Sequence, residues 1–560
     1  MTRQAIRGAV VAAVLSLATA PCIFAQQITE ARVQDLIRAA AQRAGVDAVP
    51  PSAQQPPGAS GAGARQAVAL TLDEAIKLAL DRNLDIAVQR LNPRTFDFSI
   101  AGLRASYRPT LTSTMAHQSV TNPSTQTISG AAPGTGIETG TVNWNGGVTQ
   151  NLPWGGGAIS ATLNNSRITT TSLTALFNPV FSPNWAMQFT QPLMRNFRTD
   201  NTRQQLVVTG LNQQISEIQL QAAIINTISN VRNAYWDYVF TTQSVEVARR
   251  SVELAEQLVR DNQTRVEIGT MAPIDVVQAQ SQAATQRQNL AVAEGTRRTA
   301  ELTLKRLIVA GTQDPNWSVA LEPTDRPDFR PEAVDVEAAV RRALESRTDL
   351  QQARKNQQVN DVTLKFLRNQ TLPQADLAAR YALTGQGGTQ YITQGTGINR
   401  VVTGEIPGGY RDALSSLFNA NFPTWNVALN VSYPIGTSTQ EAAVARARVQ
   451  VSQTEAQLRQ IELQIATDVT NAATQVQNNV ERVQAAQAAR DFAQRQLEAE
   501  QSKFEVGMST NYFVVQSQRD LATAQNNELQ AVLAYRRSLV ELERLQQTTL
   551  QTSNITILGR

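Results

Sequence analysis

The residue types that most often carry catalysis are few in this 560-residue sequence and lie far apart. His117 is the single histidine, and one histidine cannot make a metal site by itself, so a solvated position on a strand is the simpler interpretation. Residues 154–157 read Trp-Gly-Gly-Gly, but they lie between two strand-like patterns and not before a helix. This spacing predicts a turn and not a phosphate-binding loop. We therefore expect a protein that is not an enzyme and that holds neither a cofactor nor a metal.

The N-terminus has the pattern of an export signal. Two arginines precede an apolar run over residues 9–20, which small residues follow. Because Pro21 blocks cleavage directly after this run, we expect cleavage after Ala25 and a signal peptide over 1–25. Lipid attachment to Cys22, the single cysteine, is the alternative. Cleavage after Ala25 would leave neither a disulfide nor a thiol site.

Charge and hydropathy exclude two further classes. The formal net charge is +4, and removing the two signal-peptide arginines leaves +2, which is not the charge of a nucleic-acid-binding protein. Charged residues make up 17% of the chain, against roughly 25% in typical soluble domains. The sequence after the signal has no window of 18 consecutive apolar residues, so we expect no transmembrane helix. An exported chain of this kind is periplasmic, secreted or a barrel of the outer membrane.

The sequence is internally duplicated. Residues 72–109 align without a gap with residues 336–373, and a second register aligns 267–269 with 505–507. A repeat of about 240–260 residues is far longer than a solenoid repeat and indicates two copies of a whole helix–strand–helix unit.

Long helices are predicted around the strands of each repeat. A capping-box spacing at Thr71 starts a helix that can run to about Tyr107. Proline-free segments over about 201–267 and 439–506 can each form a helix of roughly 100 Å. Each long helix breaks at a glycine, Gly269 or Gly507, and a helical pattern of about 34 residues follows. Two shorter helices stacked end to end then match one long helix, which predicts a double-layered helical wall.

These patterns give the expected domain organisation. The predicted segments are a signal peptide at 1–25, an N-terminal helix and Pro/Gly/Ala-rich linker at 26–70, the first repeat at 71–310, an equatorial connector at 311–335, the second repeat at 336–547 and a C-terminal tail at 548–560.

Between the helices the apolar residues alternate with period two. Strands are expected over about 110–193 in the first repeat and about 374–434 in the second, where valine, leucine and aromatic residues alternate with threonine, serine and asparagine. One apolar and one polar face fit a sandwich sheet with a wet side, or a membrane barrel with lipid outside and water inside. The positions of tryptophan favour the barrel, because an interfacial aromatic girdle would contain Trp144, Trp154, Trp185 and Trp425.

At this point the sequence resembles the TolC-type outer-membrane efflux protein family. The resemblance covers about 70–547 and is carried by the order of several short motifs. They are Leu72-Asp73-Glu74-Ala75-Ile76, Ala79-Leu80, Asn83-x-Asp85-Ile86, Gln191-Pro192-Leu193, Ala234-Tyr235-Trp236-Asp237 and the two Glu-hydrophobic-Gly breaks.

The resemblance implies a mostly α-helical chain with a membrane β-barrel. Three copies would form an α-helical barrel that crosses the periplasm and continues into a β-barrel in outer-membrane lipid. The residues agree with oligomerisation, because about four strands per chain cannot close a barrel, whereas three chains would make twelve. The first repeat has 24 more residues between its helix and its last strand than the second. They can hold another hairpin, either in an extracellular loop or in the wall.

The resemblance also implies an exit duct that conducts substrates passively from an inner-membrane transporter and a periplasmic adaptor, in tripartite efflux or type I secretion. The adaptor is expected to dock on the two helix tips, with a plain helical turn as the alternative. The tip residues are Gly269, Thr270, Met271, Gly507, Met508, Ser509 and Thr510.

A gate is expected just beyond the tips. Family members often close this entrance with carboxylates, and Asp275 fits such a position, but Phe513 and Gln516 stand where acids would be in the second repeat. We therefore expect a mixed constriction in which Asp275 adds charge and Phe504 and Phe513 add apolar bulk. The alternative is that Asp275 merely stabilises the first turn of its helix.

Two other functions stay open from the sequence. A stand-alone porin would not need the long helices, and a soluble or peripheral periplasmic coiled-coil scaffold would not need the tryptophan-bearing strands. The transported substrate cannot be read from the residues.

Overall fold

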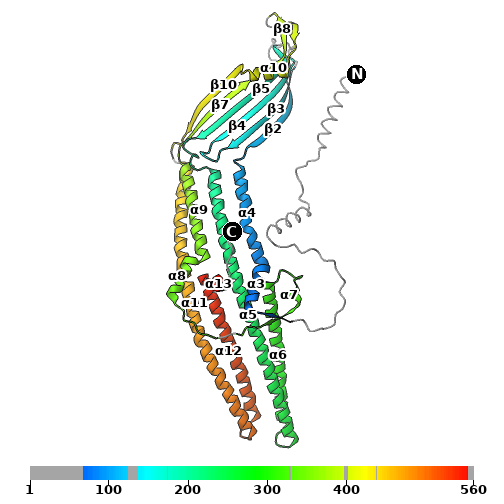
Figure 1. Ribbon diagram of the computed structural model, residues 1–560, viewed down its shortest axis with the longest axis vertical. Helices are drawn as coiled ribbons and strands as arrows, with labels where there is room; N and C mark the ends of the chain where they lie inside the picture. The colour runs from blue at the N-terminus through cyan, green and yellow to red at the C-terminus, as the bar shows by residue number, and fades with distance from the viewer. Residues whose placement is uncertain are drawn as a thin grey trace, which may run out of the picture. The chain divides into compact units, whose positions relative to one another are not determined.

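The computed structural model describes residues 67–123, 136–172, 174–326, 329–395, 401–436 and 438–552. The predicted signal peptide, the helix and linker before residue 67, Cys22 and the end of the C-terminal tail lie outside the described residues. Residues 65–560 form one compact unit. Within it, long helices carry a twisted sheet at one end (Figure 1).

The helices reproduce the predicted duplication. The long helices α5 (Asn201–Glu267) and α11 (Thr439–Glu505) have 67 residues each, and the helices that return from their tips, α6 (Pro273–Ile308) and α12 (Asn511–Gln546), have 36 each. The other paired helices are α3 (Leu72–Arg82) with α4 (Leu84–Ala105), and α8 (Val336–Ser346) with α9 (Thr348–Gln370). Short helices are α7 (Pro315–Ser318), α10 (Tyr410–Phe418) and α13 (Thr549–Thr552).

The prediction of one helix from Thr71 to about Tyr107 is wrong at Asn83. The start is right, since Thr71 and Glu74 form the reciprocal capping box. Asn83 then adopts an extended conformation, accepts hydrogen bonds from the Asp85 and Ile86 amides, and donates its Nδ2 to the Leu307 carbonyl at 3.0 Å. Its side chain thus begins a new helix and anchors it to α6. The second repeat breaks at the equivalent position, between α8 and α9.

The sheet has more strands than the expected number of about four per chain. Its strands are β2 (Thr110–Pro123), β3 (Gly136–Asn151), β4 (Ala158–Thr170), β5 (Phe177–Pro192), β7 (Gln374–Thr384), β8 (Gly387–Gln394), β9 (Val401–Ile406) and β10 (Phe422–Ser432). Six of the described strands lie side by side and antiparallel, in the order β10, β7, β5, β4, β3 and β2. The start of β5 also pairs with β8, which in turn pairs with β9.

The extra residues of the first repeat therefore form strands of the same sheet. Four strands come from this repeat alone, so the expectation of about four strands per chain is corrected to six side-by-side strands in the described chain. The second repeat also departs from the prediction of strands alone, because α10 lies inside it. Gly385 and Gly387 let this helix approach, since a Cβ at either would lie 2.1–2.5 Å from the Ala413 backbone.

The register separates one apolar face from one polar face across the whole sheet. One row of paired residues runs Leu111, Val148, Ala161, Met187, Tyr381 and Trp425. The adjacent row, on the opposite face, runs Thr110, Thr149, Ser160, Gln188, Arg380 and Asn426. Successive residues of a strand point to opposite faces, so these two rows show the predicted alternation.

Under the sheet, the helices lie in the order α11, α9, α5 and α4, each packed against the next. The core at mid-height is built around α5, where Tyr235 and Tyr238 are fully buried. The Tyr235 hydroxyl donates to the Leu70 carbonyl at 3.0 Å and the Tyr238 hydroxyl donates to the Leu321 carbonyl. These bonds hold the parallel pair of β1 (Ala67–Leu70) and β6 (Ala320–Pro323), which joins the predicted connector to the start of the first repeat.

Within the described ranges, none of the helices combines the length and the apolar character needed to cross a membrane.

Candidate functional site: the helix tips and the two-faced sheet

The two helix tips are tight turns centred on glycine. Gly269 and Gly507 have φ angles of 78° and 79°, in the left-handed region that glycine adopts without strain. The Thr270 amide donates to the Arg265 carbonyl at 2.9 Å, and the Met508 amide donates to the Lys503 carbonyl at 2.8 Å. These bonds satisfy helix-end carbonyls as in a Schellman-type ending. The two repeats therefore end in the same backbone geometry.

The tips lie against each other. Leu258 and Met271 of the first repeat pack with Phe504 and Val514 of the second. The Arg265 guanidinium lies 4.3 Å from the centre of the Phe504 ring and donates to the Phe504 carbonyl at 3.3 Å. This contact fixes the relative position of the two turns within one chain.

A small charged network supports the second tip and was missed in the sequence. Glu500 accepts hydrogen bonds from Lys503 Nζ at 2.6 Å and from Ser509 Oγ at 2.8 Å. The bond from Lys503, followed by that from Ser509, holds the pKa of the Glu500 carboxyl below its usual value. Glu500 thus links Ser509 of the tip to Lys503 of α11.

Large apolar side chains surround both turns and are exposed. They are Ile268, Ile274, Val277, Val506, Met508, Tyr512 and Phe513. Exposed apolar groups gathered at one end of a protein are typical of a protein-binding surface. Of the residues expected to dock an adaptor, Met508 has the most exposed large side chain, at 80%.

The four predicted gate residues occupy two different environments. Asp275 lies in the first turn of α6, and Phe513 projects from the start of α12, while Gln516 donates to Asp520 at 2.9 Å. Phe504 instead is 7% exposed inside the contact between the tips. Its ring packs in the contact between the joined turns, whereas Phe513 is exposed.

Buried polar side chains lie just inside the tips. The Asn511 Nδ2 donates to the Asp275 carbonyl at 3.4 Å, and Arg519 donates to Gln282 across the two repeats. Asn262 is fully buried, and neither of its amide atoms has a hydrogen-bond partner among the described residues. A buried amide without partners destabilises the packing around it.

The predicted tryptophans lie in or beside the sheet, three of them on its apolar face. Trp144, Trp185 and Trp425 lie on that face, and Trp154 lies in the turn beside the helices, 63% exposed. Val427, Leu429 and Val431 of β10 are exposed and lie between two aromatic residues, Trp425 within the strand and Tyr433 just after it. An exposed apolar band bounded by aromatic rings is the surface that a bilayer requires.

Tyr410 of α10 was not predicted, and it packs against the apolar face of the sheet. Its ring contacts Trp144 at 5.4 Å and Phe181 at 5.9 Å between ring centres. Its hydroxyl donates to Asn165 Oδ1 at 2.7 Å. The sequence around Tyr410 shows neither the strand nor the helix pattern of apolar residues, so this contact could not be predicted.

The side chains that most often bind metal ions are not clustered in the described residues. Within the described ranges, no group of three or more His, Cys, Asp or Glu side chains is placed to hold a metal ion.

The two-faced sheet above paired long helices is the architecture of outer-membrane channels with a periplasmic helical extension. Solved structures share it over most of their length. The OprN outer-membrane channel has a TM-score of 0.60 at 13% identity, covering 85% of this chain and 89% of that one. CmeC of Campylobacter jejuni has a TM-score of 0.58 at 13% identity, with 87% and 90% covered. The open-state MtrE channel of Neisseria gonorrhoeae has 0.56 at 16% identity, with 85% and 88% covered.

At these low identities the structural match shows the fold alone. The sequence profile of the family described as outer membrane efflux protein matches residues 157–309 and 339–546. The chain belongs to this family. It is an outer-membrane efflux channel protein that extends into the periplasm, as the sequence predicted. No curated protein sequence matches the chain.

Proposed function

We propose that three copies of this chain form the exit duct of a tripartite efflux or type I secretion system, which conducts substrates passively from a periplasmic adaptor and an inner-membrane transporter to the outside. The main support for the proposal is the polar face of the sheet. On this face a row of Thr, Ser, Gln, Arg and Asn side chains crosses six strands of the described chain. A water-filled lumen needs such a face, and lipid needs the other.

Closure requires more than one copy. The sheet of a single chain is open, and a barrel must join its edges. Three chains joined edge to edge would place the polar rows inside and the Leu111–Trp425 row outside. The four-helix layers would then form one helical tunnel beneath the barrel.

The adaptor docks on the tips. Thr270, Ser509 and Thr510 are short side chains, so a helical hairpin of a partner can approach the two turns closely. The exposed apolar groups beside them supply the area to bury. A coiled-coil scaffold without a channel would leave the two-faced sheet unexplained, and a stand-alone porin would leave the tips unexplained.

Asp275 gates the entrance by charge. Three copies in a narrow opening would repel one another and attract cations. The chain itself offers Asp275 no salt bridge among the described residues, so its charge is free to act on the lumen.

Single-channel recording tests the duct and the gate together. The purified protein should conduct ions in a planar bilayer without nucleotide or a proton gradient, and Asp275→Ala should change the conductance and lower the cation selectivity. Asp73→Ala is the matched control, because Asp73 also lies in the first turn of a helix but far from the tips. A trimer that never conducts would contradict the duct. An Asp275→Ala channel that only melts at a lower temperature, as Asp73→Ala would, supports the helix-dipole role instead.

A further inference from the structure

We infer that the barrel of the assembled protein has eighteen strands and that its subunit seams are formed by β2 of one copy and β10 of the next. The inference rests on the proposed trimer and adds its strand count, its seam and its width. In the described chain, β2 pairs only with β3, and β10 pairs only with β7. β2 and β10 are therefore the two edges of the six-stranded sheet, and three copies would join edge to edge at these strands.

The strand directions and the faces are compatible with this seam. Six successive antiparallel strands leave β2 and β10 running in opposite directions, so β2 meets the β10 of a second copy as one more antiparallel pair. Leu111 and Met115 share the apolar face with Val427 and Leu429. Joining the edges with Leu111 outside therefore continues both faces without interruption.

The stagger of the strands predicts the seam register. Across the sheet, Thr110 at the foot of β2 is level with Asn426. β10 continues from Asn426 down to Ser432, so its foot lies lower in the ladder, as the tilted strands of a closed barrel require. If the feet of all strands stand at one membrane border, Thr110 faces Ser432 of the next copy. Thr112 then faces Asn430, and all four side chains point into the lumen.

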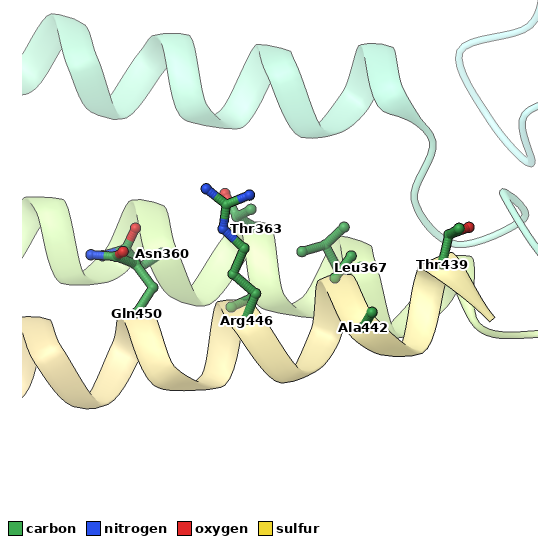
Figure 2. A pocket seen from close by; sticks show the side chains of 9 residues that line it. Asn360, Thr363, Leu367, Thr439, Ala442, Arg446 and Gln450 are labelled. Atoms are coloured by element: carbon green, nitrogen blue, oxygen red, sulfur yellow. The ribbon is translucent and has the colours of Figure 1, made fainter. Parts of the chain in front are cut away.

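The helices below carry matching edges. α4 leads into β2 and bears the exposed apolar residues Leu84, Val88, Leu91 and Phe98 along one side. α11 follows β10, and between it and α9 lies a groove of about 530 Å³. Figure 2 shows Leu367 of α9 and Ala442 and Arg446 of α11 at this groove. Because α11 and α4 are the two outer helices of the layer, the β2–β10 seam would place the exposed apolar side of α4 next to α11 of the neighbouring copy.

The consequence is a wide outer pore. Barrel diameter grows roughly in proportion to strand number, so eighteen strands give about one and a half times the diameter of twelve. Barrels of about this size enclose an open aqueous channel. The outer end then offers little resistance to bulky substrates, and selection is left to the periplasmic end.

Paired cysteines test the seam directly. The chain has one cysteine, in the predicted signal peptide, so introduced pairs can be read without interference. Under mild oxidation in outer membranes, Thr112→Cys with Asn430→Cys should link copies into covalent trimers on a denaturing gel. Ser160→Cys with Asn430→Cys tests the rival in which β2 and β3 leave the wall and β4 forms the seam of a twelve-stranded barrel. In the eighteen-stranded barrel these two positions are about 14 Å apart, three strand spacings, and should not link.

The outcomes separate this inference from the proposed trimer. Linking through Thr112 and not through Ser160 supports the eighteen-stranded barrel. Linking through Ser160 alone, or through neither pair when native mass spectrometry shows three chains, overturns it and leaves the trimer intact. Neither link together with a mass of one chain overturns both. Each single-cysteine variant controls for random collision.

Discussion

Gly507→Val should abolish export while the amount of trimer in the outer membrane stays normal. Gly507 has a φ of 79°, and a residue with a Cβ pays roughly 1–2 kcal/mol in this conformation, with a further penalty for a β-branched side chain. The space around the missing Cβ is open, so strain in the turn is the whole effect. The turn must open or tilt, which displaces Met508 and Ser509 from the surface that we propose for the adaptor. The measurement is tolerance to a compound that becomes toxic when the chain is deleted.

Gly295→Val is the matched control for this substitution. Gly295 lies inside α6 with ordinary helical geometry, and its Cβ would also meet nothing within 4 Å. It should export normally. Unchanged export by Gly507→Val, with the same trimer level, would remove the tips as the docking site.

Leu429→Arg should sharply reduce insertion and stability of the protein in lipid. Leu429 is 59% exposed on the apolar face of β10, midway between Trp425 and Tyr433. An arginine at the bilayer midplane of a barrel costs about 2–4 kcal/mol, whereas an exposed leucine on a soluble protein can be replaced at little cost. We expect less heat-resistant trimer in lipid vesicles and a lower urea midpoint.

Asn426→Arg places the same charge on the same strand but on the polar face. It should insert like the wild type, because a lumen accommodates charge. Equal tolerance of Leu429→Arg and Asn426→Arg would show that the apolar face does not meet lipid, and the sheet would then be an ordinary two-sided layer.

The long helices could be predicted because their sequences contain no interruption. Between 201 and 267 there is no proline and a single glycine, and the tip glycines stand where a helix must reverse. β3, β4 and β10 were predictable for a similar reason, since apolar and polar residues alternate along part of each strand. Length and regularity made these patterns readable.

The other features of the fold and the site depend on contacts between distant segments, which a local hydrophobic pattern does not indicate. In β2, leucine, methionine and valine are scattered among Ser, Thr, Asn and Gln, so the strand is defined by its partner β3 and not by its own pattern. Asn83 reads as a tolerable helix residue, although Asn followed by Asp85 is also an N-cap signal that could have located the break. Phe504 looked like a pore residue because its place near Gly507 is visible in sequence, whereas Arg265 above its ring is not.

The mass of the assembled protein tests the central claim most directly. The mature chain, extracted from outer membranes in mild detergent, should give a native mass spectrum of three chains, because the open sheet and the edge helices of one copy need neighbours on both sides. A stable, folded monomer would contradict the duct, the lumen and the seams together.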